Sequence, residues 1–205
     1  MPSADVTIPK DIQALYDQLE AVEQDARKLV SGLDEGLGSW RERDDSWSVA
    51  ECLDHLATGN RVYVEAMQGS ALRARQQGKL RRGPALPGWI GRWFTNYMEP
   101  PVKASFKTKA PRKIRPRKSP ALGDAFAQFI ESHHRLGNFL RRNADLDLAG
   151  VHFPNPFIWG VRFSLATGLH VLPAHERRHL WQAWRVRQSA EREIVSKSEA
   201  IGSKS

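Results

Sequence analysis

The chain has little cysteine and no long apolar run. Cys52 is its single cysteine, which excludes an intramolecular disulfide and a structural zinc site built mainly from cysteine. No stretch of about 18 consecutive apolar residues occurs, so no transmembrane helix is expected. The first residues, Met1 to Asp5, lack the basic and apolar segments of a signal peptide. These absences together predict a cytoplasmic protein that folds in a reducing compartment and has no membrane partner.

Sustained alternation of apolar and polar residues, the pattern of a half-buried strand, is also missing. Apolar residues recur instead at three- and four-residue steps in four segments, which is typical of amphipathic helices. These helices are expected over residues 9–30, 48–75, 119–143 and 159–187. They predict an all-α fold, a four-helix bundle with a long crossover between the second and third helices. We expect one domain over residues 1–190 and a polar, frayed C-terminal tail over 191–205.

Two of the expected helix starts carry capping signals. Residues 48–51 read Ser-Val-Ala-Glu, the S-x-x-E pattern in which serine and glutamate hydrogen-bond each other's backbone amides. We expect Glu51 to serve this cap rather than a neighbouring histidine. At the third helix, Ser119 followed by Pro120 predicts an N-cap and a proline at the first helical position.

The chain carries a net charge of +8, which predicts attraction for anions. Many of its positive residues crowd into residues 76–118, a basic connection rich in proline and glycine, with a short helix expected over 89–98. Three interpretations of this segment stay open: a solvated loop, a clamp for an anionic thiol cosubstrate, and a nucleic-acid-binding surface. The third is disfavoured because no helix-turn-helix or RNA-binding motif is present.

Residues 175–179 read His-Glu-Arg-Arg-His, an H-E-x-x-H motif inside the fourth expected helix. Each residue of an α-helix turns by about 100°, so His175 and His179 share one face and can bind one divalent cation. In zinc metalloproteases with this motif, the glutamate acts as a general base and a third ligand follows downstream. Here Gln182 and Arg185 stand where the extended motif has glycine and histidine, and the later glutamates lie in the polar tail. A protease is therefore disfavoured, and the third ligand must lie elsewhere.

The other histidines are not equally suitable as metal ligands. His133 and His134 are adjacent on the third expected helix, where we expect a solvated pair. His152 lies in a proline-bounded loop and is expected to be structural. His170 precedes the motif by five residues, which places it roughly 140° away from the metal-binding face. His55 is the remaining candidate, because it lies in the inner stretch of the second helix, and facing helices of a bundle can share a metal.

Two segments resemble signatures of one family. Residues 47–56 are similar to the second-helix signature of the DinB superfamily, and residues 175–182 are similar to its fourth-helix signature, in the family's order and spacing. The resemblance extends over residues 10–187, although the basic segment is not part of the signature. It implies a four-helix bundle, often a homodimer, in which some members use glutathione, mycothiol or bacillithiol. It also implies a metal held by three histidines, here His55, His175 and His179.

Three neutral imidazoles leave at least one coordination position open, which is typical of a catalytic site. Imidazole suits several divalent metals, so zinc, nickel and iron are all candidates. Gln182 lies on the face of the motif histidines and is a candidate catalytic residue that orients a water or substrate; a glutamine at the core rim is the alternative. Glu176 is a candidate general base, and an ion pair with Arg178 or with a neighbouring helix is its alternative.

The leading functional hypothesis is a metal-dependent transferase that joins a low-molecular-weight thiol to a small-molecule substrate, as the resemblance implies. The second is a metal-dependent hydrolase that uses metal-bound hydroxide. The third is a non-enzymatic helical bundle that acts as a binding module. Substitution of His179 separates them, because loss of metal from an intact fold favours a catalytic site, whereas collapse of the fold favours a structural one.

Overall fold

The protein is mostly helical, which confirms the predicted all-α class. The computed structural model describes residues 8–101 and 110–202, and a small two-stranded sheet is the only sheet in these ranges. In chain order the elements are α1 (Lys10–Val30), α2 (Glu35–Ser39), α3 (Val49–Gln76), α4 (Trp89–Met98), the 3₁₀ helix η1 (Arg112–Ile114), α5 (Leu122–Asn143), β1 (His152–Pro154), β2 (Arg162–Ser164) and α6 (Leu165–Gly202).

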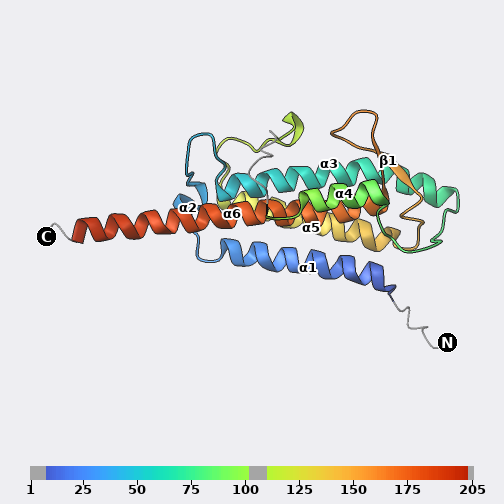
Figure 1. Ribbon diagram of the computed structural model, residues 1–205, viewed down its shortest axis with the longest axis horizontal. Helices are drawn as coiled ribbons and strands as arrows, with labels where there is room; N and C mark the ends of the chain where they lie inside the picture. The colour runs from blue at the N-terminus through green and yellow to red at the C-terminus, as the bar shows by residue number, and fades with distance from the viewer. Residues whose placement is uncertain (1–7, 102–109, 203–205) are drawn as a thin grey trace.

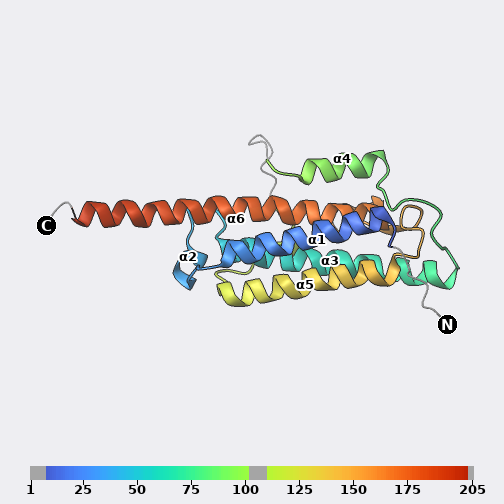
Figure 2. The same cartoon turned by 90° about the horizontal axis from the view of Figure 1, so that it is seen from below.

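Four long helices, α1, α3, α5 and α6, form the body of the molecule and lie side by side (Figures 1 and 2). Both α1 and α3 pack against α5 and α6. The buried face of α1 is the one that the three- and four-residue spacing predicts: Ile12, Leu15, Leu19, Val22, Ala26 and Leu29. Because α3 and α6 are direct neighbours, side chains that α3 and α6 direct at each other can build a common site.

The start of α3 is the predicted capping box. The Ser48 hydroxyl accepts a hydrogen bond from the Glu51 amide at 3.2 Å, and the Ser48 amide donates to the Glu51 carboxylate at 3.0 Å. The same carboxylate forms an ion pair with Arg41 at 2.6 Å. Glu51 therefore serves the cap, as expected, and helps to hold the segment that leads into α3.

The predicted cap of the third helix is wrong. Ser119 lies before the helix at φ 46°, and the N-cap position of α5 is Ala121, which has no side-chain oxygen. The first-turn amides of Leu122 and Gly123, which have no acceptor within the helix, instead donate to the carboxylate of Glu35 in α2, at 2.7 and 3.1 Å. A residue distant in the sequence thus supplies the acceptor that local capping was expected to provide.

The fourth long helix has different bounds from those predicted. Residues 152–164 hold an antiparallel hairpin in which Phe153 pairs with Phe163, so α6 begins at Leu165 rather than near residue 159. At its C-terminal end α6 continues to Gly202. The prediction of a frayed tail from residue 191 is therefore wrong up to Gly202. Ion pairs one helical turn apart support this extension, including Arg187 with Glu191 at 2.7 Å.

The basic connection between α3 and α5 contains the expected short helix, which is α4 over residues 89–98 and lies beside α6 (Figure 2). Its later part, around η1, contacts α3. Residues 102–109 of the connection lie outside the described part of the chain. Among the described helices, none combines the length and the apolar character that a membrane crossing requires.

Candidate metal centre

Three imidazoles from two helices meet between α3 and α6. The Nε2 atoms of His55 and His175 are 3.2 Å apart, and the His55 and His179 rings have centroids 4.5 Å apart. The rings of His175 and His179 are also in contact, with centroids at 4.7 Å. Ligand atoms of all three lie within 4.8 Å of one another. The structure therefore brings together the three histidines that the sequence singled out as metal ligands.

This geometry fits a bound metal ion. Two nitrogens that bind one ion tetrahedrally at about 2.0–2.1 Å lie about 3.3 Å from each other. The 3.2 Å between the Nε2 atoms of His55 and His175 is close to this value. The donor set consists of imidazole nitrogens, which suit zinc, nickel, iron and copper. The three residues could hold such an ion, and the geometry does not select the element.

Hydrogen bonds fix which nitrogen of two rings faces the cluster. The Nδ1–H of His55 donates to the backbone carbonyl of Ile114 in η1, at 2.5 Å. The Nδ1 of His179 bonds to the side-chain oxygen of Gln182 at 3.1 Å. Because both acceptors require a proton on Nδ1, the Nε2 lone pairs are left for a metal. Gln182 thus supports a ligand, while its predicted catalytic role stays a prediction.

The cluster favours neutral imidazoles. Burial, the larger cause, together with the neighbouring His55 ring lowers the pKa of His175 to about 3. Burial followed by the two neighbouring imidazoles holds the pKa of His179 well below its ordinary value, and burial also lowers the pKa of His55. A neutral imidazole is the form that binds a metal, so all three ligands are ready at neutral pH.

One side of the cluster is open to solvent and another is covered by an aromatic ring. His55 is buried, whereas His175 and His179 keep part of their surface exposed. The Trp47 ring lies against the His55 ring at 4.7 Å and the His179 ring at 5.7 Å between centroids. Sequence reasoning did not identify Trp47 as a site residue, although it stands next to the Ser48 cap in the recognised segment. Two of the three candidate ligands are therefore partly accessible from solvent.

The basic segment also forms part of the centre, which was not predicted. Ile114 supplies the carbonyl that orients His55. Three residues later, the backbone amide and the guanidinium of Arg117 bind the buried carboxylate of Asp54, each at 2.8 Å. Since Asp54 directly precedes His55, both contacts hold the segment over the same turn of α3. No local pattern in the sequence reveals this partner.

Glu176 of the motif lies in a second, fully buried cluster. One of its carboxylate oxygens accepts hydrogen bonds from the Asn60 amide at 2.8 Å and from His133 Nδ1 at 2.9 Å. These contacts connect α6 to α3 and α5. The ion pair with a neighbouring helix was the predicted alternative to a general base, and the catalytic role of Glu176 stays a prediction.

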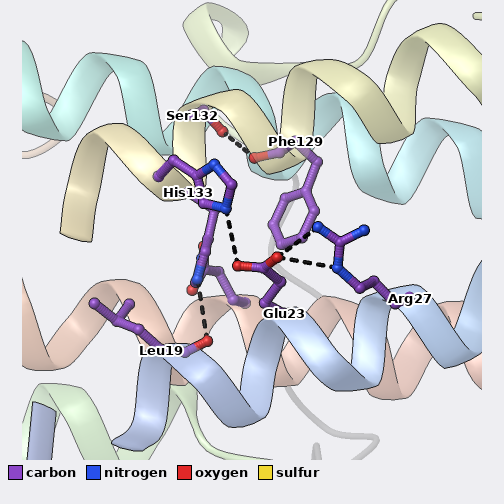
Figure 3. A network of polar contacts seen from close by, with 8 residues as sticks. Leu19, Glu23, Arg27, Phe129, Ser132 and His133 are labelled. Carbon is purple, nitrogen blue, oxygen red and sulfur yellow. Dashed lines mark hydrogen bonds and ion pairs between the residues drawn. The ribbon is translucent and has the colours of Figure 1, made fainter. Parts of the chain in front are cut away.

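The expectation of a solvated histidine pair is wrong for His133 and right for His134. His133 is buried, and its Nε2 bonds to the Leu19 carbonyl of α1 at 3.1 Å (Figure 3). Burial alone would lower the pKa of His133, but the bonded carboxylate of Glu176 raises it above the ordinary value. His134 is exposed and bonds to Glu23 at 3.0 Å. The burial of His133 could have been predicted from the sequence, because His133 follows Phe129 by one helical turn and so lies on the same face of the helix.

The two other histidines lie outside the cluster, as expected. His170 bonds to the Ala85 carbonyl at 3.0 Å, and the exposed His152 bonds to the Gly150 carbonyl at 3.0 Å. Each therefore has a local structural partner.

Comparison with known proteins gives one match. The sequence model of the DinB superfamily matches residues 18–183 of the chain. No curated protein and no solved structure matches it. The match includes both segments that carry the three histidines, and it extends over most of the four long helices. The chain belongs to the DinB superfamily.

Proposed function

We propose that this protein is a metal-dependent transferase that joins a low-molecular-weight thiol to a small-molecule substrate, within a four-helix bundle formed by α1, α3, α5 and α6. The observation that carries the proposal is the set of three neutral imidazoles, two of which keep part of their surface exposed. A structural zinc site is closed by four protein ligands, whereas three leave a position for an exogenous ligand.

The thiol in this proposal comes from outside the chain. Cys52 is the only cysteine, and it is buried. Burial, with a smaller contribution from Glu51, raises the pKa of its thiol far above the ordinary value, so it forms little thiolate at neutral pH. A metal in the cluster would supply the missing activation by stabilising an incoming thiol as thiolate.

Residues of the chain prepare the site for this chemistry. Ile114 and Gln182 orient two ligands, and Trp47 excludes water from one side of the rings. The Gln182 oxygen is engaged with His179, so the amide nitrogen of the same side chain is the group that remains to donate a hydrogen bond to a substrate. This donor would position the electrophile beside the open face of the cluster.

The experiment begins with metal analysis of natively purified protein, followed by loading with cobalt(II). Addition of glutathione is expected to change the cobalt absorption spectrum, because sulfur becomes a ligand. Glutathione, mycothiol and bacillithiol are then screened for transfer to epoxides and aryl halides. The sulfur bonds to carbon as the C–O or carbon–halogen bond breaks; the resulting alkoxide takes up the thiol proton, or halide and a proton are released. A His179→Ala variant should lose metal and transfer, while His134→Ala, which alters an exposed histidine outside the cluster, should retain both.

Two results would overturn the proposal. A cobalt spectrum unaffected by any of the three thiols shows that the site does not take a thiol. Metal-dependent ester hydrolysis in the absence of thiol, without any transfer, would assign the site to hydrolysis instead.

A further inference from the structure

A cavity of about 360 Å³ lies between the segment around η1 and the loop that joins β1 to β2. This volume falls within the usual range of small-molecule pockets, about 300–1,000 Å³. In Figure 1, the yellow-green segment before α5 and the orange loop beside β1 rise on the same side of the long helices. The lining includes Pro111, Arg112, Lys113, Asn155, Phe157 and Trp159.

One wall of this cavity is positively charged. Arg112 and Lys113 are both exposed, and neither forms an ion pair with any residue in the ranges 8–101 and 110–202. No acidic side chain of the described chain lines the cavity. An arginine fork binds a carboxylate through two parallel hydrogen bonds, and the lysine adds a point charge. This wall therefore suits a small organic acid.

The opposite wall is aromatic and held in place. Trp159 is 99% exposed, so its ring has almost no packing partner within the fold. The loop that carries it is nevertheless ordered by Asn155, whose side-chain oxygen accepts hydrogen bonds from the Phe157 and Ile158 amides at 2.8 and 2.9 Å. The Asn155 amide in turn donates to the Tyr63 hydroxyl of α3 at 3.2 Å. A preformed loop that presents a bare indole offers apolar contact to a ligand.

The cavity is also tied to the metal centre through both walls. Lys113 directly precedes Ile114, whose carbonyl orients His55. On the other side, Asn155 contacts Tyr63, which lies eight residues after His55 on α3, a rise of about 12 Å along the helix. An extended chain of three residues spans about 10 Å. That span falls short of the rise on the Tyr63 side. On the other side, Lys113 is bonded directly to the residue whose carbonyl contacts His55, so a peptide bound by the basic wall starts close to the cluster.

We propose that this cavity binds the carboxylate end of a small peptide thiol, with Arg112 and Lys113 as carboxylate ligands and Trp159 as the apolar contact. The assignment rests on the proposed function, since it takes the sulfur end to be the one that reaches the metal. The cavity thereby determines which thiol is accepted, because a thiol without a carboxylate at the right distance gains nothing from the two cations.

The test separates the carboxylate from the sulfur. The probe is γ-glutamyl-alanyl-glycine, which is glutathione with alanine in place of cysteine, and binding is measured by calorimetry on the metal-loaded protein. The double variant Arg112→Ala/Lys113→Ala is expected to weaken binding by at least about tenfold, as expected for lost hydrogen bonds to a charged group. Trp159→Ala should weaken it several-fold.

The matched control is Lys118→Ala. Lys118 is an exposed cation in the same segment that does not line the cavity, so its removal should change binding by less than about twofold through screened long-range charge alone. Metal content and circular dichroism are measured for every variant. A glutamine pair, Arg112→Gln/Lys113→Gln, repeats the test if the alanine pair perturbs the backbone at Ile114.

The outcomes for the cavity and for the transferase are distinguishable. Equal binding of the probe to the double variant and to Lys118→Ala overturns the cavity assignment, even if glutathione still changes the cobalt spectrum. Probe binding that depends on Arg112 and Lys113, with a cobalt spectrum unaffected by glutathione, supports the carboxylate site and removes the thiol step. No detectable binding of the probe to the unmodified protein overturns the cavity assignment.

Discussion

Two consecutive residues of α6, His175 and Glu176, lie in two clusters that shift histidine pKa values in opposite directions. His175 faces two other imidazoles, and burial lowers its pKa to about 3. Glu176 faces His133, whose pKa its carboxylate raises despite burial. The comparison shows that a histidine's surroundings decide its protonation: without an acidic partner a buried imidazole favours the neutral form that can bind a metal, and a bonded carboxylate raises its pKa. Substitutions in the two clusters test this division.

The largest effect is expected for His179→Ala, which removes one of three ligands. Metal affinity should fall on the order of a thousandfold, since structural sites derive about 10–16 kcal/mol from a full ligand set. The helical content should stay unchanged because the residue is only half-buried and its ring contacts are the other two imidazoles and Trp47. A chelator titration measures the affinity, and circular dichroism checks the fold. Retained affinity would mean that the three imidazoles do not share a metal.

The next effect concerns the second cluster. His133→Ala leaves the Glu176 carboxylate buried without its charged partner, and breaking a buried pair costs about 3–5 kcal/mol of unfolding free energy. Urea unfolding measures this loss. His134→Ala is the control, because an exposed ion pair contributes about 0–1 kcal/mol. Similar losses in both variants would contradict the ion pair.

Removal of a hydrogen-bond partner should have a smaller effect than removal of a ligand. Gln182→Ala deletes the acceptor that orients His179, and loss of such a partner typically lowers metal affinity about 10–100-fold. Gln188→Ala, an exposed glutamine later on the same helix, is the control and should bind metal normally. If the two variants bind metal equally, the contact does not tune the site.

The smallest effect is expected in the pH dependence of stability of the metal-free protein. The lowered pKa of His175 contributes stability that is present above about pH 6.5 and is lost as the pH falls towards 3, because the unfolded chain takes up the proton first. The raised pKa of His133 contributes stability that is full below pH 6.5 and is lost as the pH rises through the folded value. Urea unfolding should therefore show an acidic slope that His175→Gln reduces and an alkaline slope that His133→Ala reduces. The reverse assignment of the two slopes would contradict the division of roles.

Much of the fold and two of the three candidate ligands followed from local patterns in the sequence, whereas the choice of His55 rested on elimination and on the resemblance to the DinB superfamily. The apolar spacing of α1 and the capping box of α3 depend on contacts within one or two helical turns, so they can be recognised without the remaining chain. The same holds for His175 and His179, whose four-residue spacing places them on one helical face. The ion pairs that extend α6, such as Arg187 with Glu191, have the same local spacing, although a frayed tail was expected there.

Other features depended on contacts between distant segments. The cap of α5 comes from Glu35 of α2, and the start of α6 depends on the pairing of Phe153 with Phe163. The Asp54–Arg117 contact joins two residues far apart in the sequence, and the residues around each of them do not indicate the other as a partner. Such contacts form only after the long helices pack, so spacing along the chain cannot reveal them.

By itself, the sequence determined the helical faces and the motif residues, because helix geometry converts spacing directly into direction. Only the tertiary structure decided that His133 joins Glu176 in the interior, that Ile114 orients His55, and that basic side chains and an indole line the same open cavity. Burial and the charge of the nearest partner set the protonation of each imidazole, and both are properties of the packed helices rather than of any one segment.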